Sequence, residues 1–113
     1  TLAWLSPTPS SAEADDDVHR IIIQVDVKDP GTMNLALNNA ANINRYYMDQ
    51  GEEAEIEIVT FGPGLIMLRS DSSPVKDRIA SFAQNYDNIH FKACANTIRN
   101  MERKSGKKVH LLE

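Results

Sequence analysis

Residues 21–25 read IIIQV, a nearly unbroken run of β-branched apolar side chains. Such a run is typical of a strand that is covered on both faces of a parallel sheet. Asp29 and Pro30 follow it. They favour a helix start, because Asp accepts hydrogen bonds from the first free amides and Pro has no amide to lose there. We therefore expect a central strand that leads directly into a helix.

The remaining apolar residues continue this alternation of strand and helix. Helical spacing from Met33 to Tyr47 predicts a long helix that ends at Gly51. A short helical turn is expected at 65–68. Further strands are predicted at 56–61, 89–94 and 109–112, and further helices from Ser73-Pro74 and from Asn96-Thr97, the last one closed by Gly106.

The element order is β-α-β-α-β-α-β as far as the chain runs. This order predicts an α/β fold with a parallel sheet, helices on both faces and right-handed crossovers. The chain has 113 residues, 42% of them hydrophobic and 25% charged, which suits one globular domain. We place that domain at residues 18–113.

The charge balance limits the classes of partner. A net charge of -4 argues against general attraction to nucleic acid, which is itself a polyanion. No apolar run approaches the ~20 residues of a membrane span, so we expect no membrane insertion. We interpret the one basic cluster as the solvated end of a helix, in preference to a polyanion site; it comprises Arg99, Arg103, Lys104, Lys107 and Lys108.

Residues 1–17 differ in composition from the rest of the chain. An apolar stretch is followed by Ser, Thr and Pro, then by Ala12-Glu13-Ala14, then by three aspartates. This order resembles the end of a signal peptide with its cleavage site. We slightly favour export to the periplasm over the alternative, a flexible N-terminal extension of a cytoplasmic protein.

Cys94, the one cysteine of the chain, is the main candidate for chemistry. It lies between a predicted strand and a predicted helix, where the positive end of the helix dipole stabilises a thiolate. The alternative is a structural role, because free cysteines are often buried and inert. His90 is ~13 Å away along an extended strand, so direct pairing with Cys94 is not expected.

Other candidate sites have weaker patterns. The loop Gly62-Pro63-Gly64 lacks the known phosphate-binding motifs, and a tight turn is favoured over a small-anion site. The three histidines have no metal-ligand spacing. Loops 26–32, 61–65 and 93–97 follow parallel strands, so we expect them at one edge of the sheet, with Cys94 near Gly62-Pro63-Gly64.

Several stretches together resemble the DsrE/DsrF-like family of small sulfur-metabolism proteins. The match runs from about Val18 to the end of the chain and rests on residues 22–25, 33–40, 61–64 and 93–97. The resemblance implies a flavodoxin-like fold, homo- or hetero-oligomers such as trimers and hexamers, and a persulfide-carrying cysteine at the position of Cys94. For this chain we expect a homo-oligomer, a trimer or hexamer or alternatively a dimer. Similar proteins usually continue through a further strand and helix, which implies that the domain here lacks its last part.

Our leading hypothesis is a sulfur carrier, in which Cys94 holds sulfane sulfur as a persulfide and passes it to an acceptor thiol. We expect the amides of Asn96 and Thr97 to stabilise the anion, and Gly62, Pro63 and Gly64 to shape the entrance. Donor and acceptor would be proteins or small thiols, and no cofactor is expected. The main alternative is a non-catalytic binding or assembly module with a structural Cys94. A nucleotide- or flavin-binding domain is a third interpretation, by fold analogy alone.

Overall fold

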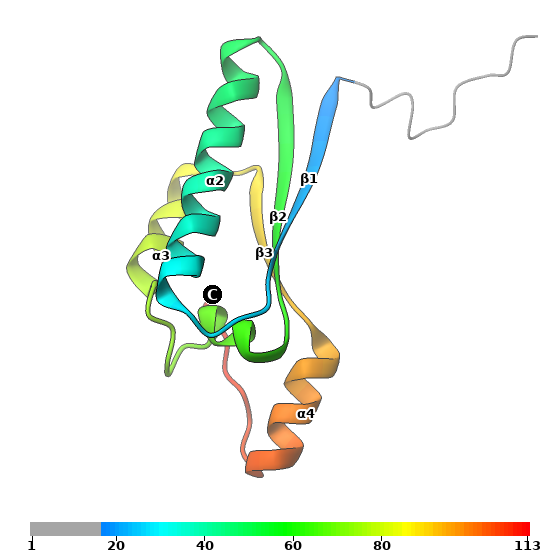
Figure 1. The fold of residues 1–113 in the computed structure, drawn as a ribbon, viewed down its shortest axis with the longest axis vertical. Helices are drawn as coiled ribbons and strands as arrows, with labels where there is room; N and C mark the ends of the chain where they lie inside the picture. The colour runs from blue at the N-terminus through cyan, green and yellow to red at the C-terminus, as the bar shows by residue number, and fades with distance from the viewer. Residues whose placement is uncertain (1–16) are drawn as a thin grey trace, which may run out of the picture.

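The structure is a computed structural model, and it describes residues 17–113. Three parallel strands form the sheet in the order β1-β2-β3: β1 is Val18–Val25, β2 is Glu53–Thr60 and β3 is Ile89–Ala93. The predicted α/β class with a parallel sheet is confirmed, and the arrangement is consistent with a flavodoxin-like fold (Figure 1). The N-terminal segment, apart from Asp17, lies outside the described residues.

Helices connect the strands and follow the last one. They are α2 (Pro30–Asp49), the 3-10 helix η1 (Gly62–Leu68), α3 (Lys76–Asn85) and α4 (Ala95–Ser105). In Figure 1, α2 and α3 lie side by side against the sheet, whereas α4 extends away from its carboxyl end. None of the helices within residues 17–113 is long and apolar enough to cross a membrane.

The start of α2 follows the chemistry expected of Asp29. Its carboxylate accepts hydrogen bonds from the backbone N–H of Thr32 at 2.9 Å and from the Thr32 hydroxyl at 2.7 Å. The hydroxyl and then the amide of Thr32 hold the pKa of Asp29 below its usual value. Asp29 is therefore the predicted N-cap, and it fixes where the chain turns from the end of β1 into α2.

One face of the sheet carries the hydrophobic core. Ile56 and Ile58 of β2 are fully buried there, against Met33 and Leu37 of α2, which are also inaccessible. Phe82 of α3 completes this layer of packing on the same face. The helices α2 and α3 thus shield the same side of the strands.

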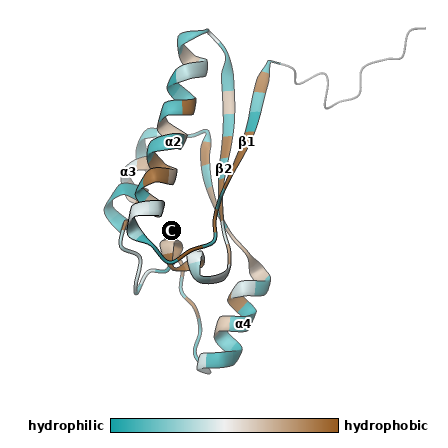
Figure 2. Ribbon diagram, in the orientation of Figure 1, coloured by the Kyte–Doolittle hydropathy of each residue, from teal (hydrophilic) through white to brown (hydrophobic). Residues whose placement is uncertain are grey.

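The opposite face of the sheet is open over the described residues. The sequence predicts helices on both faces, but more and less exposed residues alternate along β1 and β2, so every second side chain points away from α2 and α3. Figure 2 shows hydrophilic and hydrophobic residues following one another along β2. Ile22, which pairs in register with Glu57, is 63% exposed. In β2 the buried residues alternate with partly exposed ones, which is the pattern of a strand covered on one face.

The fourth strand predicted at 109–112 does not join the sheet. Leu111 forms one antiparallel bridge with Arg69, and the N–H of Leu112 donates to the carbonyl of Leu68 at 2.8 Å. Ser70 donates in the same way to His110. The segment therefore pairs with the chain that leaves η1, which removes its backbone groups from pairing with β3.

The two sheet faces predict different responses to truncation. Ile58→Ala should lower the free energy of unfolding by ~2–5 kcal/mol, because it leaves a cavity in the core. In the monomer, measured at low protein concentration, Ile22→Ala should change it by less than about 0.5 kcal/mol, since the side chain is exposed in the single chain. Urea unfolding measures both. An equally large loss for Ile22→Ala would mean that this face is covered in solution.

Candidate functional site

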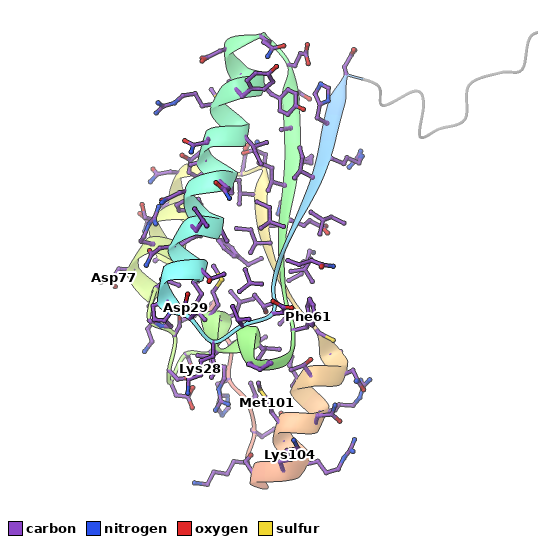
Figure 3. The ribbon with its side chains drawn as sticks, in the orientation of Figure 1. Lys28, Asp29, Phe61, Asp77, Met101 and Lys104 are labelled. Carbon is purple, nitrogen blue, oxygen red and sulfur yellow. The ribbon has the colours of Figure 1, made fainter. Side chains whose placement is uncertain are left out.

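The three loops expected at one edge of the sheet do meet there. The N–H of Phe61 donates to the carbonyl of Val25 at 3.2 Å, and the N–H of Cys94 donates to the carbonyl of Thr60 at 2.9 Å. These bonds extend the pairing of β1 with β2 and of β2 with β3 past the last paired residues. Figure 3 shows Phe61 at this edge, where β2 ends. The ends of all three strands are consequently held in one place.

Gly64 brings η1 against the end of β1. A Cβ atom at this position would lie 2.2 Å from the carbonyl oxygen of Val25 and 2.9 Å from the Cα of Asp26. Backbone atoms cannot move aside as the tip of a flexible side chain can. Only glycine therefore permits the approach, and the loop Gly62-Pro63-Gly64 begins a 3-10 helix packed on β1 in place of the expected tight turn.

Gly62 connects the same loop to α4. Its φ of +53° lies in the left-handed region that glycine adopts without strain. Its N–H donates to the hydroxyl oxygen of Thr97 at 3.0 Å. The N–H of Gly64 donates to the carbonyl of Phe61 at 3.1 Å, and Pro63 has no N–H. The three residues thus shape the site, with their amide donors already used inside the protein.

Cys94 is the N-cap of α4. It has extended backbone angles, φ -68° and ψ 120°, and its carbonyl accepts the N–H of Ile98 at 3.1 Å. The sequence predicted that Asn96 and Thr97 would cap this helix, but the helix starts at Ala95, so both lie inside its first turn. The thiol is therefore closer to the free amides of the helix than expected, and it is half-buried.

The surroundings of Cys94 favour its thiolate. The backbone N–H of Thr97 lowers the pKa of the thiol most, followed by the Thr97 hydroxyl, while partial burial acts in the opposite direction. The N–H of Asn96 and the charge of Arg99 lower the pKa further. The Cys94 side chain forms no capping hydrogen bond to the helix. The amides of Asn96 and Thr97 therefore remain available to an anion at this position.

The role of the Thr97 hydroxyl was not predicted from the sequence. Its backbone amide was expected to act on the sulfur, but its hydroxyl also links Cys94 to Gly62. Because the hydroxyl oxygen accepts from Gly62, its proton is free to point at the sulfur. Adjacency of the loops 61–65 and 93–97 was the signal that could have indicated this bond.

The remaining candidates have structural explanations. His19 bonds to Glu52 at 2.6 Å and stacks on Tyr47, with ring centroids 4.0 Å apart. His90 bonds to Glu55 at 3.2 Å on the open face, which agrees with the expectation that it does not serve Cys94. Within residues 17–113 no three His, Cys, Asp or Glu side chains are grouped so that they could hold a metal ion.

The chain matches no family model and no curated protein. It is similar to a solved structure, the protein of unknown function MTH1491 from Methanobacterium thermoautotrophicum. The two are 28% identical, with a TM-score of 0.65 over 84% of this chain and 77% of that chain. This likeness supports the fold over most of the chain and adds nothing about its chemistry.

The role of the Thr97 hydroxyl can be tested by substitution. Thr97→Val keeps the shape of the side chain but removes the donor to the sulfur, so the pKa of Cys94 should rise. Alkylation by iodoacetamide, followed against pH, increases as the thiol ionises, and in Thr97→Val this increase should shift to higher pH. Thr97→Ser keeps the hydroxyl and serves as the control. Identical profiles for Val and the unsubstituted protein would contradict the assignment.

The close approach at Gly64 makes a second prediction. Gly64→Ala should lower the free energy of unfolding by about 2 kcal/mol or more, because two backbone segments must separate. Gly31→Ala is the matched control: there the nearest atom to an added Cβ is a carboxylate oxygen of Asp29 at 3.4 Å, an ordinary contact. Thermal or urea unfolding compares the two variants, and equal stability would mean that η1 does not pack on β1 as described.

Proposed function

We propose that this protein is a sulfur carrier that holds sulfane sulfur on Cys94. The observation that carries the proposal is the placement of the only thiol, half-exposed at the first turn of α4, with Thr97 and Asn96 lowering its pKa. A lowered pKa supplies thiolate, the form that attacks sulfur. The resemblance to DsrE/DsrF-like proteins supports the same assignment.

The transfer consists of two displacements at sulfur. The Cys94 thiolate attacks the terminal sulfur of a donor persulfide, R–S–SH; the Cys94 S–S bond forms, the donor S–S bond breaks, and the donor leaves as the thiolate RS⁻. An acceptor thiolate then attacks the terminal sulfur of the Cys94 persulfide and releases Cys94 as thiolate. One sulfur moves in each step, and neither step requires an external oxidant or reductant.

Three features of the chain would assist these transfer steps. The N–H groups of Asn96 and Thr97 would stabilise the anionic sulfur before and after each attack. The hydroxyl of Thr97, positioned by Gly62, would donate to the same atom. The packed loop at Gly62–Gly64 would restrict the side from which a donor reaches the sulfur.

Homo-oligomer formation is part of this proposal. The open face of the sheet exposes Ile22 beside Glu57, together with half-exposed Val59. A second copy of the chain could cover that face, in a dimer or in a trimer or hexamer. The same face also supports the second candidate function, an assembly module in which Cys94 has no covalent role.

Sulfur loading separates the two functions. After incubation with thiosulfate or a small persulfide, the intact protein should gain the mass of one sulfur atom, and reduction should remove it. Cys94→Ser should fold normally, as judged by circular dichroism, and should gain nothing. Loading of Cys94→Ser, or no loading of a protein whose thiol also resists alkylation, would contradict the carrier function and favour the assembly module.

A further inference from the structure

The helix that begins at the thiol is largely uncovered. None of the residues of α4 is buried. Its described side-chain hydrogen bonds to other segments are few: Thr97 accepts the N–H of Gly62 at 3.0 Å, the Arg69 guanidinium reaches the sulfur of Met101 at 3.9 Å, and Glu102 accepts the N–H of Val109 at 3.0 Å. Figure 3 shows α4 leading away from the sheet, with Lys104 near its far end. Most of its length is therefore free to meet another molecule.

Positive charge is concentrated on this part of the chain. Residues 92–108 hold six of the twelve lysines and arginines but only one of the sixteen acidic residues. That acid, Glu102, is occupied by the backbone of Val109. The rest of the chain keeps six basic and fifteen acidic residues. The six basic side chains are all exposed: Arg99, Arg103 and Lys104 lie on α4, Lys92 lies in β3, and Lys107 and Lys108 follow the helix. Together they are called here the basic helix surface.

Local helix chemistry accounts for only part of this surface. Arg103 and Lys104 lie in the last turn of α4, where cations complement the negative end of the dipole. Lys92 lies in β3, before the helix, and Arg99 lies in the second turn of α4, outside the last turn where the dipole favours a cation. The helix dipole therefore does not explain the presence of these two cations. Figure 2 shows that α4 is mostly hydrophilic, so packing of apolar side chains does not explain the position of these basic residues either.

We propose that the basic helix surface is the docking site for an acidic protein that exchanges sulfur with Cys94. The exchange step rests on the proposed carrier function. The docking surface itself is inferred from the distribution of basic side chains and does not depend on that function. α4 has 11 residues and spans about 16 Å, the scale of a local patch on a protein. The excess of acidic residues elsewhere would repel an extended polyanion, which disfavours nucleic acid.

Docking on this surface would place the partner correctly for transfer. Cys94 is at the N-terminal end of α4, so a partner that lies along the helix can bring its own sulfur to that end. Opposite charge also raises the rate of encounter by about tenfold or more at low salt. The partner therefore needs an acidic patch beside an accessible cysteine.

The test measures thiol exchange of Cys94 with charged peptides. Two peptides each carry one cysteine activated as a thiopyridyl disulfide, beside a run of glutamates in one and of glutamines in the other. Cys94 attacks the peptide sulfur, and thiopyridine leaves. At ~10 mM salt the glutamate peptide should react about tenfold faster, and at ~1 M salt, where the Debye length falls to about 3 Å, the two rates should converge.

Substitutions locate the surface. Arg103→Gln combined with Lys104→Gln leaves Arg99 beside the thiol unchanged, so the glutamine peptide should react at its original rate while the advantage of the glutamate peptide falls severalfold. Arg45→Gln combined with Lys76→Gln, on exposed positions of α2 and α3, is the matched control and should change neither rate. Equal rates for the two peptides at low salt, or an advantage that survives in the α4 variant, would overturn the proposal.

Two further outcomes remain distinguishable. If an RNA oligonucleotide suppresses the reaction of the glutamine peptide more strongly than a soluble polyglutamate does, the surface belongs to nucleic acid and the proposal fails. Sulfur loading is measured separately. A protein that shows charge-dependent exchange but never gains sulfur retains the docking surface and loses the carrier function.

Discussion

The contact between Gly64 and the end of β1 determines the geometry of the whole site. Without a side chain, Gly64 lies against the carbonyl of Val25, where any Cβ would come within 2.2 Å of that oxygen. This contact places η1 at the carboxyl edge of the sheet. Gly62, two residues earlier, can then donate its N–H to Thr97 in α4. Three segments that are distant in sequence are thereby joined by the backbone of one short loop.

This constraint has a direct chemical consequence at Cys94. A helix N-terminus alone offers amides, which weaken in effect when the first turn frays. Here the first turn of α4 is tied to η1 through Thr97, and the end of β3 is tied to β2 through the N–H of Cys94. The sulfur thus lies between two anchored elements, with donors in fixed positions. Such fixed donors cost little reorganisation when charge develops on sulfur.

Local sequence signals predicted much of the fold. The Asp29 cap, the helical spacing of α2 and the glycine that ends α4 at Gly106 each depend on neighbouring residues, and all three are confirmed. The open sheet face and the pairing of Leu111 with Arg69 depend on which distant segment supplies a partner, and no local pattern contains that information. The same distinction applies to the site. The position of Cys94 between a strand and a helix could be predicted from local spacing, whereas the hydrogen bond between Gly62 and Thr97 depends on the packing of η1 on β1.

The central claim is that Cys94 passes sulfur on as well as accepting it. The most direct measurement loads the protein with isotopically labelled sulfane sulfur, removes the donor, adds a small acceptor thiol and follows both molecules by mass spectrometry. The account predicts that the labelled sulfur leaves Cys94 and appears on the acceptor as a persulfide, with the protein restored to its original mass. Label that stays on the protein, or that never enters it while the thiol is accessible, would contradict the account.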